Sequence, residues 1–314
     1  MMKDKKIDIL AIVGPTATGK TKLGIEIAKK FGGEIINADS MQVYKNLNIG
    51  TAKPTIDELE EIPYHLINIV EKNQEFNLFD YVKLAKKTIG DIRERKKLPI
   101  LVGGTGLYID SVVSGVKLGV IPEDSNLKQE LSQKYDVYGP EYLMAELKKI
   151  DVEAANRIDK NNKKRLIRAL EINYLTGKTL NEIYRETRNN ISEYNTFFLG
   201  LNYKDRALLY KNINDRVDKM ISLGLLNEAR QLFNDGYSKT SIQAIGYKEF
   251  ENYFNGSNSL NEVIEKIKQN SRRYSKRQMT WFKKNKQILW LSVDEYKNFD
   301  DLIRYSCQII EDYI

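Results

Sequence analysis

The stretch GPTATGKT (residues 14–21) follows the apolar run IDILAIV (7–13) and precedes KLGIEIAKKF (22–31). It matches the complete pattern G-x-x-x-x-G-K-[S/T], in which the backbone N–H groups of a glycine-rich loop surround phosphate oxygens. The start of the following helix adds a partial positive charge, and a threonine hydroxyl at this position suits Mg²⁺. A plain glycine turn is the structural alternative. We expect a pyrophosphate-like group, with its organic part left open, to be held by Gly14, Pro15, Thr16, Ala17, Thr18, Gly19, Lys20 and Thr21, and Mg²⁺ to be held by Thr21.

Strand and helix patterns alternate on both sides of this loop, and this alternation indicates an α/β domain with a mainly parallel sheet. Short apolar runs predict strands at 7–13, 34–39, 65–70, 98–104, 196–203 and 287–293. Helical spacing is found at 21–31, 77–97, 206–224, 226–236 and from about 260 to 284. Residues 124–190 have helical spacing and almost no strand signal. We therefore predict a P-loop NTPase-like core over 1–117 and 200–314, with an inserted all-helical domain over 118–199.

The composition excludes several classes of protein. One cysteine, Cys307, permits no intrachain disulfide, and one histidine, His65, leaves no His/Cys zinc cluster. No run approaches the roughly 18 apolar residues of a membrane span, and the charged start of the chain does not resemble a signal peptide. We expect a cytoplasmic protein without a membrane partner, in which Cys307 is a small core side chain on a C-terminal helix.

Asp39 ends the predicted strand EIINAD, at the sheet edge where the phosphate loop would lie. It could hold Mg²⁺ through water, or it could act as a general base toward a nucleophile aimed at the phosphate ligand. The structural alternative is a helix N-cap, because Asp39-Ser40 begins a new element. A third strand, PILV (99–102), runs into GGTG, where Thr105 offers a hydroxyl at the same edge, although GGTG alone also suits a tight turn.

Basic residues are concentrated in two helical segments. The net charge is +7, and no acidic residue occurs from Lys266 to Val293. The segment 267–287 carries Arg272, Arg273, Lys276 and Arg277 among aromatic residues, a combination that suits nucleic acid. A solvated helix face over a core stripe is the ordinary alternative. The segment NNKKRLIRALE (161–171) is a second basic helix, and two such surfaces suggest an extended polyanionic partner.

The motifs GPTATGKT, NADSMQVYK, IGTAKPT, PILVGGTGLYI, RLIRALE, AIGYKE and RRYSKRQMTWF occur together and in order between residues 7 and about 293. This set resembles that of the bacterial tRNA dimethylallyltransferases. Two departures are the pair Tyr64–His65, where the family often has two histidines, and DKNNKKR, a variant of a usual His-Pro-Asn-Asp stretch.

The resemblance implies transfer of a dimethylallyl group from dimethylallyl diphosphate to N6 of the adenosine 3′-adjacent to the anticodon of tRNA. The phosphate loop would then hold the diphosphate of a prenyl donor. Asp39 would take the proton of the amino group, Thr105 would place a substrate, and Arg216 would reach the diphosphate. The base would have to leave its stack and enter a protein channel.

The resemblance also implies a set of residues that contact the anticodon stem-loop. Ser40, Met41 and Gln42 would line the channel together with Asp39, and the inserted helix would grip the anticodon arm through Lys164, Arg165, Leu166, Ile167 and Arg168. We expect a monomer. The rival interpretations are a P-loop kinase or nucleotide-dependent ATPase acting on a nucleotide or RNA, with Asp39 as a metal ligand, and a non-catalytic RNA-binding protein.

Overall fold

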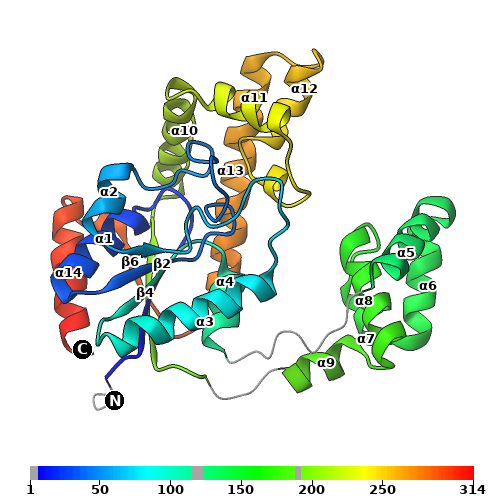
Figure 1. The fold of residues 1–314 in the computed structure, drawn as a ribbon, viewed down its shortest axis with the longest axis horizontal. Coiled ribbons are helices and arrows are strands. Elements are labelled where there is room, and N and C mark those ends of the chain that lie inside the picture. The colour runs from blue at the N-terminus through cyan, green and yellow to red at the C-terminus, as the bar shows by residue number, and fades with distance from the viewer. Residues whose placement is uncertain (1–5, 115–123, 188–191) are drawn as a thin grey trace. The chain divides into compact units, whose positions relative to one another are not determined.

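A six-stranded parallel sheet forms the centre of the protein in a computed structural model that describes residues 6–114, 124–187 and 192–314 (Figure 1). The strand order is β3-β2-β4-β1-β5-β6. The register places Leu10 opposite Ile100 on one side of β1 and opposite Phe197 on the other. The strands are β1 (Ile9–Val13), β2 (Glu34–Asn37), β3 (Tyr64–His65), β4 (Pro99–Val102), β5 (Thr196–Asn202) and β6 (Ile288–Ser292).

The central strands are apolar throughout because helices cover both faces of the sheet. On one face, α1 (Lys20–Phe31) and α14 (Phe299–Glu311) contact each other and pack on Leu10 and Ile12 (Figure 1). On the other face lie α3 (Leu78–Glu94) and α4 (Gly106–Val113). Cys307 is buried on α14, as predicted. The α/β fold expected from the alternating pattern is confirmed.

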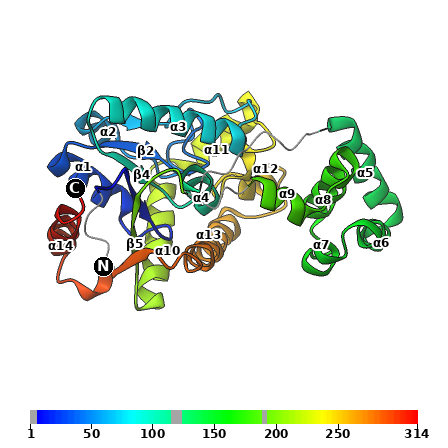
Figure 2. The ribbon, with the colours of Figure 1, turned by 90° about the horizontal axis from the view of Figure 1, so that it is seen from below.

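A group of helices stands beyond the carboxyl ends of the strands. The long helices α10 (Arg206–Ser222) and α13 (Leu260–Phe282) lie side by side (Figures 1 and 2). Ser259 and Glu262 form a capping box that fixes the start of α13. The remaining elements of the core are α2 (Ile56–Glu61), α11 (Leu225–Asp235), η1 (Ser241–Gln243), η2 (Lys248–Phe250), α12 (Glu251–Phe254) and η3 (Val293–Glu295).

The strand predicted at 65–70 is wrong for most of its length. Only Tyr64–His65 pair with β2, and Val70 makes an isolated bridge to Tyr44. Leu66 and Asn68 have positive φ angles of 59° and 55°. A left-handed backbone cannot continue a strand, so the apolar run turns away from the sheet.

Residues Ser114–Glu193 form a second compact unit with its own core, described here by itself. Its helices are α5 (Ser125–Tyr138), α6 (Pro140–Ile150), α7 (Val152–Arg157), α8 (Lys163–Thr176) and α9 (Leu180–Thr187). Leu131, Leu143, Leu147, Leu166 and Leu170 meet at its centre. Asp151 is buried there because its carboxylate accepts hydrogen bonds from the backbone N–H groups of Ala154 and Leu180.

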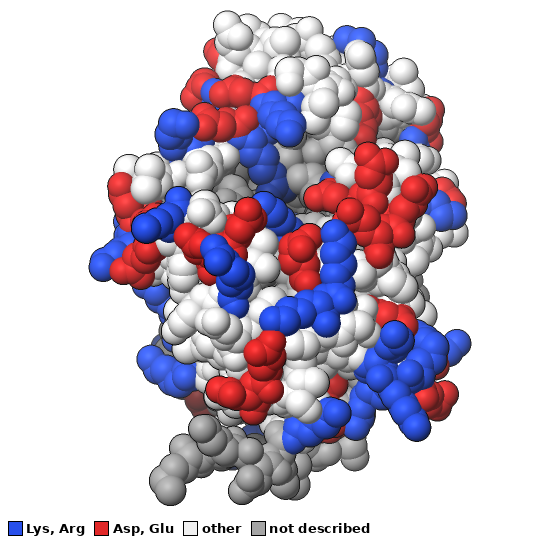
Figure 3. Space-filling view, turned by 90° about the vertical axis from the view of Figure 1, so that its left-hand side faces the viewer, with Lys and Arg blue, Asp and Glu red and all other residues white. Residues whose placement is uncertain are grey.

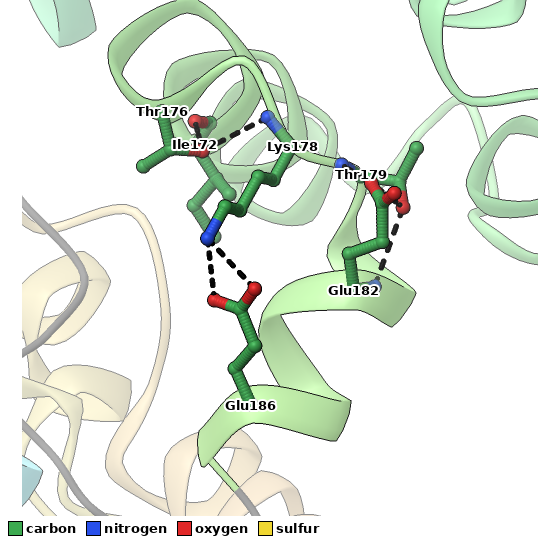
Figure 4. Close-up of polar contacts among 6 residues, drawn as sticks. All are labelled: Ile172, Thr176, Lys178, Thr179, Glu182 and Glu186. Atoms are coloured by element: carbon green, nitrogen blue, oxygen red, sulfur yellow. Dashed lines mark hydrogen bonds and ion pairs between the residues drawn. The ribbon is translucent and has the colours of Figure 1, made fainter.

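Side-chain contacts fix the turn between α8 and α9 (Figure 4). Thr176 Oγ1 donates to the carbonyl of Ile172 at 2.6 Å and accepts from the N–H of Lys178. Thr179 and Glu182 exchange hydrogen bonds at the start of α9, and Lys178 Nζ pairs with both carboxylate oxygens of Glu186 at 2.7 Å. These local contacts fix the start of α9 together with the hydrogen bond from the Leu180 N–H to the buried Asp151.

The division between the two units lies near the predicted boundaries but not on them. The first unit comprises 1–113 and 194–314. The predicted boundary at 117/118 lies outside the described residues. The predicted boundary at 199/200 cuts through β5, which pairs with β1 from Thr196 to Gly200 and therefore belongs to the core.

Candidate active site

The phosphate loop follows β1 and leads into α1, as its sequence predicts. Gly14 and Gly19 have φ angles of 139° and 85°, and Ala17 adopts a left-handed φ of 64°. A left-handed alanine is uncommon and costs conformational energy, which points to a functional constraint on this turn. Thr18 Oγ1 donates to the Pro15 carbonyl at 2.9 Å, and Lys20 Nζ donates to the same oxygen at 2.6 Å.

Lys20 is the most strongly perturbed cation of the site. Burial and, to a smaller extent, the nearby Arg216 guanidinium lower the pKa of its ammonium group to about 7, although Asp39 opposes both effects. Arg216, on α10, donates from NH1 to Thr16 Oγ1 at 3.0 Å. Burial also lowers the pKa of Arg216, and Asp39 again opposes this. Two half-buried cations with one carboxylate near them form a site that favours an added anion.

Asp39 follows β2 and lines a cavity of about 200 Å³. Its Oδ1 accepts from the N–H of Met41 at 2.9 Å, so the aspartate caps this turn as well as facing the cavity. Asn37 holds the turn, because its Oδ1 accepts from the N–H of Asp39 and its Nδ2 donates to the carbonyl of Asp39. The carboxylate therefore comes from a rigid loop at the carboxyl end of the sheet.

Thr105 is hydrogen-bonded to Ser40 and is not itself among the cavity-lining residues. Its Oγ1 accepts from the N–H of Ser40 at 3.1 Å, and its own N–H donates to the carbonyl of Ala38. Thr105 thus joins the loop after β4 to the loop after β2, and the geometry makes it a positioning residue for Ser40 and Asp39.

The cavity has a polar end and an apolar wall. Thr16, Asp39 and Arg216 form the polar end, and further polar groups come from α13, from the end of η1 and from Lys248 at the start of η2. Much of the apolar wall comes from three residues of α10 that are spaced by three or four positions, Ile213, Val217 and Met220. Ile245 and, from α13, Ile267 add to this wall. The arrangement can hold an anion at one end and a small apolar group beside it.

Gln42 does not line this cavity, contrary to the prediction. Its side chain is buried and donates from Nε2 to the carbonyls of Thr51 and Ala52 at 3.1 and 3.3 Å. It holds the turn of the IGTAKPT segment, from which Gly50 and Thr51 reach the cavity. Ser40 and Met41, by contrast, line it as predicted.

Several residues of the site were not predicted from the sequence. Tyr274, Lys248 and the apolar residues of α10 line the cavity. Burial raises the pKa of Tyr274, Asp39 raises it further, and hydrogen bonds with Thr105 and Gln278 oppose this, so its hydroxyl stays protonated. The sequence did contain a signal for the α10 residues, because Ile213, Val217 and Met220 lie at helical spacing around Arg216 on a predicted helix.

Glu228 is another unassigned residue, and it acts at a distance from the cavity. Its carboxylate accepts from the backbone N–H groups of Asn48, Ile49 and Gly50 at 2.9 to 3.0 Å. The hydroxyl of Tyr247 donates to the same carboxylate at 2.5 Å. The ring of Tyr247 lies so close to Gly50 that a Cβ there would be 2.6 Å from it. One glutamate of α11 therefore anchors the loop that carries Gly50 and Thr51.

The basic residues predicted to contact tRNA differ in exposure. On α13, Arg273, Lys276 and Arg277 are exposed and Arg277 lines the cavity, whereas Arg272 is half-buried and donates to Asn214 Oδ1 of α10 at 2.6 Å. On α8, Lys164 and Arg165 are exposed.

The other predicted contacts on α8 are corrected by the structure. Leu166 and Ile167 are buried in the core of the helical unit, so their side chains are not available to tRNA. Arg168 pairs at 2.6 Å with Glu171, whose side chain is fully buried. The Leu-Ile pair is the apolar face of an amphipathic helix, while the neighbouring cations form its outer face.

The face that carries α1 and α14 has Lys, Arg, Asp and Glu side chains interspersed (Figure 3). Ion pairs join the two helices, with Lys22 Nζ 3.4 Å from Asp300 Oδ1 and Lys30 Nζ 2.6 Å from Glu311 Oε1. Such paired charges form a solvated surface and provide no continuous basic stripe for a polyanion.

Comparisons with known proteins agree with this geometry. The family model described as IPP transferase matches residues 42–285, and the one described as isopentenyl transferase matches residues 7–73. A tRNA dimethylallyltransferase of Caldanaerobacter subterraneus subsp. tengcongensis is 49% identical over 300 residues, which cover 94% of this chain and 95% of that protein. One of Geobacillus thermodenitrificans is 45% identical over 302 residues, with 95% of each chain covered.

Solved structures show the same similarity. The full-length tRNA isopentenylpyrophosphate transferase of Bacillus halodurans matches with a TM-score of 0.73 and 43% identity, over 97% of this chain and 96% of that one. A eukaryotic dimethylallyltransferase acting on tRNA matches with a TM-score of 0.81 and 30% identity, over 98% of this chain and 80% of that one. With this sequence identity over nearly its whole length and the phosphate loop in place, the chain belongs to the tRNA dimethylallyltransferase family.

Proposed function

We propose that the protein transfers the dimethylallyl group of dimethylallyl diphosphate to N6 of the adenosine 3′-adjacent to the anticodon in tRNA and releases diphosphate. The observation that carries this proposal is the cavity that Asp39 and Arg216 line together with Thr16 of the phosphate loop, beside an apolar wall. A diphosphate fits the cationic end and a five-carbon chain fits the wall. The N6–C1 bond forms as the C1–O bond breaks, and the amino group loses one proton.

Lys20, Arg216 and the N–H groups of the phosphate loop stabilise the departing diphosphate. Negative charge grows on the bridging oxygen as the C1–O bond breaks, and fixed donors in a buried site offset that charge. The pKa of Lys20 lies near 7 because the lysine is partly withdrawn from water, so a bound diphosphate provides it with a favourable partner. The hydrogen bond from Arg216 to Thr16 holds the guanidinium at the loop.

Asp39 accepts the proton of the adenosine amino group. A carboxylate within hydrogen-bond reach of the nucleophile can both orient it and remove its proton. Ser40 and Met41 lie beside Asp39 on the cavity wall, and Thr105 keeps this turn in place. The target base has to leave its stack to reach the carboxylate.

Mg²⁺ fits the residues at the phosphate loop. Among the described residues, no cluster of three or more His, Cys, Asp or Glu could form an all-protein cage for a metal. Mg²⁺ at such sites keeps several waters and is held largely by substrate phosphates, and here the Thr21 hydroxyl would be its ligand from the protein. When bound, the ion would supply additional neutralisation of charge on the diphosphate.

The anticodon stem-loop is the proposed tRNA element that the protein grips. The exposed cations Lys164 and Arg165 of the helical unit, and Arg273 and Lys276 of α13, are suited to its phosphates. We further propose that the protein acts as a cytoplasmic monomer. Within the described ranges, no helix is long and apolar enough to cross a membrane.

The deciding experiment incubates unmodified tRNA with radiolabelled dimethylallyl diphosphate and Mg²⁺, without ATP. We expect label in the tRNA, on N6 of the adenosine next to the anticodon, after nuclease digestion and chromatography. Lys20→Ala should abolish the transfer, whereas Lys148→Ala, an exposed change on α6, should not. If label entered tRNA only when ATP was supplied, a P-loop kinase or ATPase activity would replace the proposal.

A further inference from the structure

Gln278 is a buried polar residue on α13 that the described mechanism does not use. Only 5% of its surface is exposed. Its Oε1 accepts from the backbone N–H of Thr16 at 2.9 Å, and its Nε2 donates to the carbonyl of Gly104 at 3.0 Å. One amide therefore bridges the phosphate loop and the loop that follows β4.

The two partners fix the orientation of this amide. A backbone N–H requires the oxygen and a carbonyl requires the nitrogen, so a flipped amide would lose both bonds. The fit is also tight, since a Cβ on Gly104 would lie 2.1 Å from Gln278 Nε2 and 3.6 Å from the carbonyl oxygen of Gly14. The side chain thus fills the space between Gly104 and the start of the phosphate loop.

This contact occupies one backbone N–H donor of the phosphate loop. The backbone N–H of Thr16 is engaged by Gln278, and the Thr16 hydroxyl accepts from Arg216. Gln278 thereby occupies a backbone N–H donor of the kind that a loop of this type otherwise offers to phosphate. The donors left for a ligand lie farther along the loop, toward Lys20 and the start of α1.

We propose that Gln278 determines the specificity of the loop for a diphosphate over a triphosphate. It withholds the Thr16 N–H and fills the space between Gly104 and the start of the phosphate loop, so the third phosphoryl group of a nucleoside triphosphate finds neither that donor nor that space. This inference rests on the proposed function, because it explains how a nucleotide-type loop selects a prenyl diphosphate. Gln278 does not touch the reacting atoms.

The test measures the affinities of inorganic pyrophosphate and inorganic tripolyphosphate with Mg²⁺ by calorimetry, without tRNA or a prenyl group. Wild type should bind pyrophosphate more tightly. Gln278→Ala frees both the N–H and the space, and should reduce this preference by about tenfold or more, the value of one hydrogen bond to a charged group. Gln278→Met frees the N–H but keeps most of the volume, so its preference should fall between the two.

Gln269→Ala, a change of the same type nine residues earlier on α13, is the matched control and should keep the wild-type preference. Thermal melting of each variant checks that it is folded, and Gln278→Met serves as the test should Gln278→Ala not fold. An unchanged preference in both Gln278 variants would overturn the inference. A wild-type protein that prefers tripolyphosphate would instead count against the proposed function itself.

Discussion

Asp39 is the side chain on which the proton balance of the proposed reaction depends. It lines the cavity at the cationic end, where its negative charge acts to raise the pKa values of Lys20 and Arg216. A metal-ligand role and a general-base role lead to different consequences when the carboxylate is replaced by an amide of the same shape.

We expect Asp39→Asn to lower the single-turnover rate of label transfer by about 10²–10⁴-fold, the usual effect of losing a general base. The affinity for pyrophosphate, measured by calorimetry, should change much less. Asp57→Asn, on the exposed surface of α2, is the control and should keep the wild-type rate. Loss of pyrophosphate binding at a normal rate for bound substrate would identify Asp39 as a metal or ligand anchor.

Lys20 has a pKa of about 7, well below the ordinary lysine value of 10.5. Above pH 7 the lysine of the ligand-free protein is largely neutral, and a bound diphosphate favours its charged form. Pyrophosphate binding should therefore take up close to one proton at pH 8, and its affinity should fall about tenfold per pH unit above pH 7.

Proton uptake is measured by calorimetry in buffers that differ in ionisation enthalpy. Lys20→Met is the control, because it removes the titrating group and should remove the part of the uptake that the lysine contributes. Equal uptake in wild type and in Lys20→Met would show that the lysine keeps its charge in the ligand-free protein.

At the scale of elements, side chains from the helices beyond the sheet hold the loops at its carboxyl edge. Trp281 of α13 donates to Asp110 Oδ2 at 2.7 Å and packs so closely on α4 that a Cβ on Gly106 would be 2.2 Å from its ring. Glu228 of α11 holds the loop 48–50 through hydrogen bonds from the backbone N–H groups of that loop. These contacts explain why motifs far apart in the chain depend on one another.

We expect Glu228→Gln to lower the free energy of unfolding by about 1–3 kcal/mol, because a neutral amide cannot replace the charged acceptor of three backbone N–H groups. Urea unfolding followed by circular dichroism measures this change. Transfer activity should fall as well, since Gly50 and Thr51 line the cavity. Glu251→Gln, an exposed change on α12, is the control, and equal stability of the two variants would contradict the anchoring role.

At the scale of the whole molecule, the basic residues belong to two units with separate cores. If the helical unit contacts tRNA phosphates through α8, the replacement of Lys164 and Arg165 by alanine should reduce the steepness of log affinity against log salt by about 1.4–1.8, roughly 0.7–0.9 per lost contact. Binding of pyrophosphate should be unchanged.

Filter binding of tRNA between 50 and 200 mM salt measures the slope. The matched control replaces Lys148 and Lys149, two exposed lysines on α6 of the same unit, by alanine. If both double variants changed the slope equally, the effect would reflect net charge and not a contact made by α8.

The sequence by itself determined the α/β core, the phosphate loop and the helical insertion, because each depends on local patterns such as apolar runs, helical spacing and a complete eight-residue motif. It also determined the family, through motifs that occur together and in order. The left-handed residues that end β3 at His65 were not predicted, since a positive φ at Leu66 or Asn68 leaves no signal in an apolar run.

Only the tertiary structure decided which side chains meet. Gln278 lies 262 residues from Thr16 along the chain, and Glu228 lies 178 residues from Gly50. Sequence spacing carries no information on such pairs, because they form only when the sheet brings its loops together and the helices pack across them. For the same reason the motifs wrongly predicted that Gln42 and Leu166 contact tRNA. Packing buries both side chains.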